Sequence, residues 1–281
     1  MATAGYSTAG FRDRGVEEAL DEIAAAGFSA IELLCDAPHV EVPFEGRELD
    51  EFRSGLDRRG LRVTTVHGPM TYNVLGAPDE GWRKEKVVVL GKALRFSGEL
   101  GAAGMVIHPI PNPKFVPEPK DPTLPGRMEA ATRRSLDELV PVAAEAGVCM
   151  LLENLPYECH YPLLSTRELR TLVDEYPADQ VGLVVDTGHA WTSGIDPKDE
   201  ILAAGPRLRG MHLQDVDLKE PNDNHWLPTH GGLQWDAIRG ALKEVGYAGM
   251  WTFEVIVPRH GETQSELAAG TRAVATSWGL D

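Results

Sequence analysis

Short apolar runs alternate along the chain with longer amphipathic stretches, and this alternation constrains the fold more than any other feature of the sequence. Several runs, such as VGLVVD and VCMLLE, are apolar at successive positions, which is typical of parallel strands buried on both faces. The expected strands are Thr3–Tyr6, Ala30–Leu34, Arg62–His67, Met105–His108, Val148–Glu153, Val181–Asp186, Leu208–His212 and Met250–Glu254.

Helices are expected between these strands, from the helical spacing of apolar residues and from capping signals. One segment opens with STRE, a capping box in which Ser165 faces Glu168, and stops before Pro177. The expected helices are Val16–Ala26, Lys84–Leu100, Arg127–Ala146, Ser165–Tyr176, Trp235–Val245 and Glu262–Trp278, with a weaker one near Pro197–Ala204. Eight strand–helix units over residues 1–281 predict a single-domain α/β fold, a (β/α)8 TIM barrel.

Two long connections interrupt this regular alternation. The proline-rich segment Pro109–Gly126 follows the fourth expected strand, and Asp215–Gly232 follows the seventh. Loops of this length in a compact domain are usually binding loops or lids. Both follow a strand, so both belong to the carboxyl-terminal face of the barrel, where barrel enzymes build their active sites.

Six consecutive expected strands end in residue types that bind metals. These strand-end residues are His67, His108, Glu153, Asp186 with His189 three residues later, His212 and Glu254. In a barrel these ends converge on one point. The loop after the seventh strand adds an Asp-x-His pair, Asp223 and His225. Carboxylates and neutral imidazoles are the ligands that Zn²⁺ and Mn²⁺ prefer, and a divalent ion offsets the repulsion among gathered carboxylates.

The sequence therefore predicts a divalent metal ion as cofactor, Mn, Zn or Co. One ion is expected from the strand-end residues. His230, before Gly231–Gly232, is a candidate substrate contact, with an ordinary loop role as the alternative. Trp82, Trp191 and Trp226 are candidate walls against the C–H faces of a sugar, with core packing as the alternative.

Composition limits the kinds of partner and the cellular location that can be expected for this protein. The formal net charge of −16 argues against a nucleic-acid partner, because phosphate binding needs a concentrated basic surface. No stretch approaches the roughly 18 apolar residues expected of a membrane span. Three cysteines without CxxC spacing, and an amino terminus without an apolar signal segment, predict a cytoplasmic protein without disulfides. Association into a homo-oligomer stays open, since no stretch identifies an interface.

The motifs LLEN, VVDTGHAWTSGIDP, MHLQDVD with DNH downstream, and TFEV resemble those of the xylose isomerase-like barrel superfamily. The similar branch contains sugar phosphate isomerases and epimerases and endonuclease IV-type enzymes (AP endonuclease family 2). The resemblance implies a principal ion held by Glu153, Asp186, His212 and Glu254, with Glu153 and Glu254 also acting as an acid/base pair in the isomerases.

In the endonuclease-like members, the resemblance implies two further ions. Residues like His67 and His108 share Glu153 with a second ion, and residues like His189, Asp223 and His225 hold a third. The chain departs from the family pattern after DNH, where Thr229–His230–Gly231 replaces the usual Gly-x-Gly turn.

The leading hypothesis is a metal-dependent isomerase or epimerase of a small carbohydrate-like ketone or aldehyde. Glu153 or Glu254 would remove the proton next to the carbonyl and the other would return it, through an enediolate-type intermediate. The candidate substrate-binding residues are His67, His108, His189, His230 and Trp191. A lyase or dehydratase begins with the same proton abstraction. The alternatives from other classes are a zinc phosphoesterase of the endonuclease IV type and a barrel that binds a ligand without catalysis.

Overall fold

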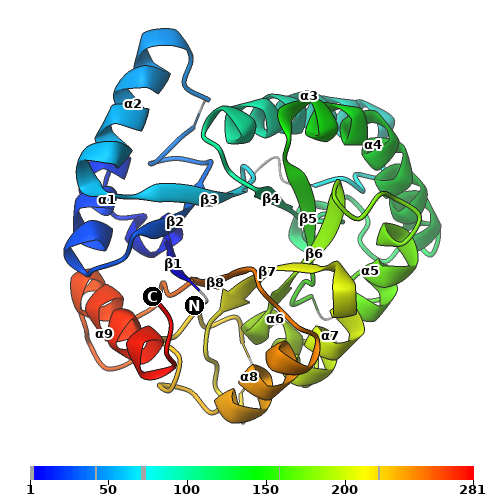
Figure 1. Ribbon diagram of the computed structural model, residues 1–281. Coiled ribbons are helices and arrows are strands. Elements are labelled where there is room, and N and C mark those ends of the chain that lie inside the picture. The colour runs from blue at the N-terminus through cyan, green and yellow to red at the C-terminus, as the bar shows by residue number, and fades with distance from the viewer. Residues whose placement is uncertain (1–2, 42, 71–73, 158, 221) are drawn as a thin grey trace.

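Eight parallel strands form a closed barrel in chain order, and β8 pairs back with β1 (Figure 1). This computed structural model describes residues 3–41, 43–70, 74–157, 159–220 and 222–281. The strands are β1 (Ala4–Ser7), β2 (Ala30–Leu34), β3 (Arg62–His67), β4 (Gly104–Ile107), β5 (Cys149–Glu153), β6 (Val181–Asp186), β7 (Leu208–Leu213) and β8 (Met250–Phe253). The predicted (β/α)8 barrel is confirmed.

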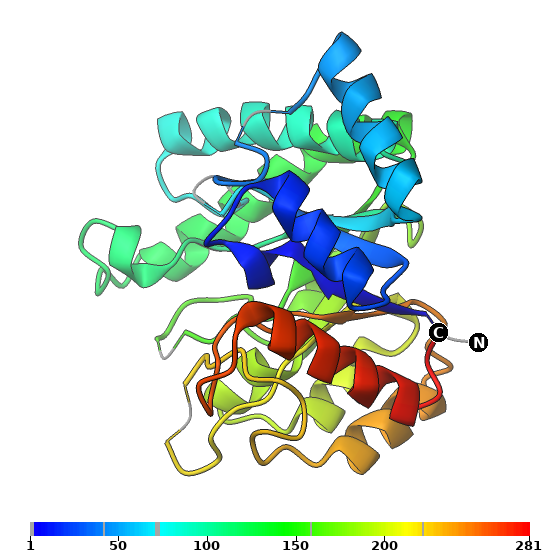
Figure 2. The same cartoon turned by 90° about the vertical axis from the view of Figure 1, so that its left-hand side faces the viewer.

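Helices surround the barrel as an outer layer (Figures 1 and 2). They are α1 (Val16–Ala25), α2 (Gly46–Arg59), α3 (Glu80–Glu99), α4 (Leu124–Ala146), α5 (Thr166–Val173), α6 (Thr187–Thr192), α7 (Pro197–Ala204), α8 (Trp235–Glu244) and α9 (Gln264–Ser277), with short 3-10 turns at Thr8–Phe11, Pro113–Phe115 and Gly205–Arg207. The two chain ends lie side by side, where the Ala4 amide donates to the Asp281 carbonyl over 2.8 Å. No helix of the described ranges is long and apolar enough to cross a membrane.

Two helices have no counterpart among the predicted segments. Helix α2 is rich in charged residues and buries a narrow stripe that includes Leu49, Phe52 and Leu56. Helix α6 is a short helix that starts directly at the end of β6. The other boundaries differ from the predicted ones by a few residues. The predicted fourth and eighth strands are each one residue too long at the carboxyl end, so His108 and Glu254 lie immediately after their strands.

A small apolar cluster lies beneath the strand ends. Val106, Leu151 and Val184, from β4, β5 and β6, form a buried group separate from the main core. Side chains two positions apart in a strand point to the same face. The faces of Leu151 and Val184 therefore continue at Glu153 and Asp186. The alternation of the strands thus places the site residues directly above an apolar floor.

Candidate metal centre and active-site cavity

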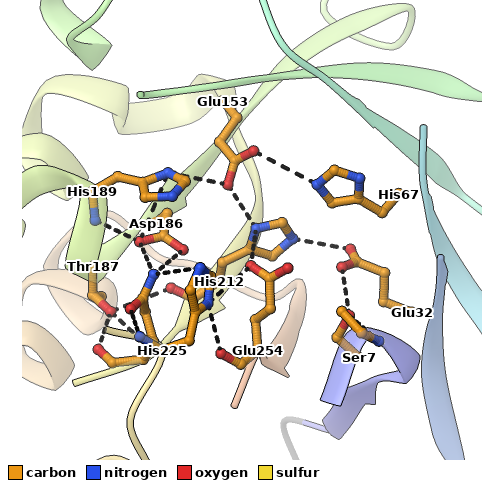
Figure 3. Close-up of polar contacts among 12 residues, drawn as sticks. Ser7, Glu32, His67, Glu153, Asp186, Thr187, His189, His212, His225 and Glu254 are labelled. Atoms are coloured by element: carbon orange, nitrogen blue, oxygen red, sulfur yellow. Dashed lines mark hydrogen bonds and ion pairs between the residues drawn. The ribbon is translucent and has the colours of Figure 1, made fainter. Parts of the chain in front are cut away.

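Four residues from the ends of β5 to β8 form the centre of the site. Glu153, Asp186, His212 and Glu254 are all buried, and each offers a ligand atom that lies within 4.8 Å of the others. His212 Nδ1 lies 2.7 Å from Glu153 Oε1 and 3.3 Å from Glu254 Oε2 (Figure 3). We call these residues the four-ligand group. They match the predicted principal ligand set.

A glutamate of β2 supports this group from the other side of the imidazole. Glu32 Oε2 lies 3.0 Å from His212 Nε2, and Glu32 also accepts hydrogen bonds from Ser7 and Thr65 (Figure 3). A carboxylate on the outer nitrogen of a ligating histidine fixes the ring orientation and raises its basicity. The sequence analysis missed Glu32. The available signal was an acidic residue inside the otherwise apolar strand AIELL.

Two outer groups of ligand-type residues flank the four-ligand group. In the first, His67 and His108 approach the second oxygen of Glu153, and His108 Nε2 lies 3.2 Å from Oε2. In the second, Asp223 lies between two imidazoles, at 3.4 Å from His189 Nε2 and 3.0 Å from His225 Nε2. All nine ligand positions implied by the resemblance are therefore gathered in one region.

Three of these histidines have one ring nitrogen anchored to the main chain. The Nδ1 atoms of His67, His189 and His225 lie 2.9–3.1 Å from backbone carbonyl oxygens. A carbonyl only accepts, so each Nδ1 is the donor and each Nε2 faces the carboxylates. When such a ring is neutral, the lone pair of Nε2 is therefore available to an ion held among them. This is the arrangement of metal-ligating histidines.

The donor set fits a divalent ion. Glu153 Oε2 is buried and receives no well-aligned hydrogen bond from the residues that the structure describes, although His108 Nε2 lies close to it. Burial raises the pKa of Asp186 to about 6. Burial alone would lower the pKa of His212, but the carboxylates of Glu32 and Glu254 outweigh it and hold that pKa well above its usual range. A buried cluster that draws positive charge onto its histidines is one that a cation stabilises.

The DTGH motif builds the junction between β6 and α6. Asp186 caps the helix, because its carboxylate accepts the His189 amide over 2.7 Å. Gly188 leaves room for Gln214, since a Cβ at this position would lie 2.4 Å from Gln214 Cδ. The motif therefore delivers a carboxylate and an imidazole to one point and holds both in place.

Gln214 connects the four-ligand group to the outer group on the β7–α8 loop. Its Nε2 donates to Asp186 over 3.1 Å and to Asp223 over 2.9 Å, while its Oε1 accepts the His225 amide over 2.7 Å. The sequence analysis quoted this residue within HLQD but gave it no role. An amide is not a preferred zinc ligand, so a search for ligand types passes over it.

A cavity of about 680 Å³ opens above the site. The predicted substrate contacts His67, His108 and His189 line it, together with Glu153, Asp223, His225 and Glu254. Two exposed cationic residues, Arg12 and Lys114, line it as well.

The other predicted substrate contacts lie elsewhere. His230 lies 3.2 Å from Glu262 and forms a separate group of ligand types with Glu262 and His260. Trp191 lines a neighbouring cavity. Trp226 stacks beneath Arg259, with the guanidinium 4.2 Å from the ring centre. Substrate contact by His230 and Trp191 stays a prediction that this cavity does not favour.

Comparison with known proteins identifies the family. The family model described as "Xylose isomerase-like TIM barrel" matches residues 20–273. The chain belongs to this xylose isomerase-like TIM barrel family. The resemblance inferred from the strand-end motifs is therefore confirmed.

Members of the xylose isomerase-like family with different activities are similar to this chain. A D-psicose 3-epimerase of Enterocloster bolteae is 28% identical over 253 residues, covering 88% of this chain and 79% of that protein. A probable endonuclease 4 of Methanoculleus marisnigri is 28% identical over 256 residues, covering 84% and 85%. A crystal structure of a D-tagatose 3-epimerase-like protein superimposes with a TM-score of 0.82 at 22% identity, covering 99% of this chain and 97% of that one, which supports the fold.

Proposed function

We propose that the protein is a divalent-metal-dependent epimerase or isomerase of a sugar or a related polyol ketone or aldehyde. One observation carries the proposal. Of the four-ligand group, Glu153 and Glu254 line the cavity, whereas Asp186 and His212 do not. The two carboxylates of this group that reach the substrate space are therefore the two of its members suited to move a proton. The similarity to a D-psicose 3-epimerase supports the same reaction class.

The reaction follows from these positions. Glu153, Asp186, His212 and Glu254 would hold the ion, which supplies Lewis-acid polarisation of the carbonyl and the adjacent hydroxyl. One of Glu153 and Glu254 removes the proton next to the carbonyl, giving an enediolate-type intermediate, and the other returns a proton. His108 and His189 line the same cavity and would orient the substrate hydroxyls.

The test incubates the protein with ketoses and aldoses in D2O, with Mn, Co or Zn supplied in turn. NMR and mass spectrometry then detect deuterium that replaces the proton next to the carbonyl. An epimerase returns a sugar of the same carbon skeleton with one deuterium at the epimerised carbon. Loss of the elements of water would assign a dehydratase, which begins with the same proton abstraction. If no ketose or aldose exchanges this proton with any of the three metals, the proposal is wrong.

A zinc phosphoesterase is the second candidate, because both outer groups are complete and the similarity to a probable endonuclease 4 is of comparable extent. Three ions would activate water and stabilise a phosphate, and Arg12 and Lys114 line the cavity. The net charge of −16 weighs against a DNA substrate. Cleavage of an abasic-site duplex at low salt by zinc-loaded protein would favour this candidate over the epimerase.

A further inference from the structure

A second, apolar cavity adjoins the active-site cavity. Its volume is about 500 Å³, and its own walls are Val74, Trp82, Ile110, Pro111 and Phe115. These residues come from the loop before α3, from α3 itself and from the proline-rich connection after β4. We call this cavity the apolar compartment.

The two cavities are continuous in their lining. Met70, His108, Asn112 and Tyr157 line both. His108 is also a member of the first outer group, so the apolar compartment begins beside residues that could hold an ion. A single molecule that lies over Glu153 therefore reaches the apolar compartment past His108 and Tyr157.

Two of the apolar side chains that line the apolar compartment are exposed to solvent. Phe115 is 74% exposed and Met70 is 40% exposed, and both belong to the small set of large apolar side chains exposed among the described residues. Exposed apolar area is unfavourable in water, and where it gathers at a cavity it commonly marks a binding site. Phe115 and Met70 come from different loops, yet both of these exposed apolar side chains line this cavity.

The volume and the aromatic walls define the occupant. The active-site cavity itself, about 680 Å³ with carboxylates and imidazoles, suffices for a free sugar. A free sugar has no apolar group that matches a further 500 Å³. Trp82, Phe115 and Tyr157 bring three aromatic side chains to the apolar compartment, and aromatic walls favour a flat aromatic guest in stacked or edge-to-face contact.

We infer that the substrate is a glycoside-like molecule, in which a carbonyl-bearing sugar lies over the ions and an aromatic group lies in the apolar compartment. This inference rests on the proposed function for the sugar end alone. The aromatic end is argued from the apolar compartment. The two parts are therefore separable by experiment.

The experiment compares the 4-nitrophenyl and methyl glycosides of the same 3-keto-hexose. Binding is measured by calorimetry on the metal-loaded native enzyme with the 3-hydroxy forms of the two glycosides, which have no carbonyl and are not turned over, and turnover is measured with the 3-keto forms. We expect the aryl glycoside to bind about tenfold more tightly than the methyl glycoside, since an aromatic contact of this kind contributes roughly that factor.

Two substitutions in the apolar compartment locate the effect. Phe115→Ala and Trp82→Phe, each in the metal-loaded enzyme, should reduce the aryl-to-methyl affinity ratio to about threefold or less. Phe115 is exposed, so its replacement leaves the core intact. The matched control is Val88→Ala, an apolar residue of α3 that is 60% exposed and lies outside the apolar compartment, which should keep the full ratio.

Each outcome is decisive. Equal affinity for the aryl and methyl glycosides overturns the inference, and so does an aryl preference that survives both substitutions. An aryl preference that Phe115→Ala abolishes, without turnover of either glycoside or of any free ketose or aldose by the native enzyme, supports the aromatic site while removing the proposed epimerase reaction. Turnover of the free ketose with no aryl preference supports the epimerase reaction and overturns the aromatic site.

Discussion

The four-ligand group and the outer group on the β7–α8 loop use the same residue types on different supports. Glu153, Asp186 and His212 are final or near-final residues of strands whose neighbours are fixed by the barrel hydrogen bonds, and they are at most 1% exposed. Asp223 and His225 lie in a long loop, and the Asp223 side chain is 34% exposed. The sheet therefore positions the first set, whereas Gln214 and the main-chain contacts of a loop position the second.

This difference indicates where an ion is held most firmly. Ligands on strand ends lose little further freedom when an ion binds, because the sheet has already ordered them. Ligands on a loop lose more conformational freedom when an ion binds, and water competes with the ion for the exposed carboxylate of Asp223. We therefore expect the resident ion in the four-ligand group, with the outer groups filled at higher metal concentrations.

The largest expected effect is that of Glu153→Gln on turnover. The substitution removes both a ligand and a proton-transfer group, so the rate should fall by about a thousandfold or more. Epimerisation is followed by NMR under saturating metal. The matched control is Glu129→Gln, a glutamate of α4 whose side chain is 46% exposed and lies outside the cavity, which should retain full activity. Retention of a tenth of the rate by Glu153→Gln would remove this residue from the chemistry.

Removal of the metal should destabilise the folded protein measurably. An ion present at 100 times its dissociation constant contributes about 2.7 kcal/mol to the free energy of unfolding. This corresponds to a decrease in Tm of roughly 5–8 °C after chelation. Metal analysis accompanies the thermal scan, and His260→Ala controls for an ion held by His230, His260 and Glu262. A Tm that does not change on chelation would contradict the expectation that a bound ion stabilises the folded protein.

Glu32→Gln should weaken metal binding without removing a ligand. Without the carboxylate behind His212, the imidazole is less basic and its orientation is no longer fixed. Metal affinity is therefore expected to fall by about 10- to 100-fold. Competition with a fluorescent chelator measures the affinity. Glu48→Gln, an exposed change on α2, is the control. Equal affinity in both variants would show that Glu32 only completes the local packing.

The smallest effect is expected from Asp223→Asn, and it tests the comparison directly. If the ion in the four-ligand group performs the reaction, epimerase activity should fall by less than about tenfold, since the change affects a group that positions substrate or a weaker ion. The fully exposed Asp236→Asn serves as control. A loss above a hundredfold, with two or three zinc ions per native chain, would instead favour phosphoester hydrolysis.

The sequence predicted the parts of the site that follow from strand periodicity. Six of the eight apolar strands end where a ligand type begins, so Glu153, Asp186 and His212 could be named as candidate ligands without knowing any contact. Glu32 could not, because its partner His212 is 180 positions away in the chain and only closure of the barrel brings them together. Gln214 was missed for another reason, since its role is to join two carboxylates rather than to bind an ion.

Helix α2 illustrates a similar limit in the fold. Its charged surface leaves only a narrow apolar stripe, which is a weak periodic signal, and no side chain caps its first turn. The apolar compartment was also beyond prediction from the sequence. Trp82 and Phe115 are far apart in the chain, and only the packing of the loop after β4 beside α3 makes them parts of one wall.

The backbone anchoring of three histidines has a consequence for evolution. The carbonyls of Gly68, Asn154 and Glu254 hold the rings of His67, His189 and His225, and every residue type supplies such an oxygen. Random replacement at Gly68 or Asn154 therefore leaves the tautomer of the neighbouring ring intact, provided the main chain keeps its path, whereas Glu254 is kept by its own role in the site. A lineage built on this barrel can then change what it acts on by altering the walls of its cavities, while the protonation pattern of the centre is inherited unchanged.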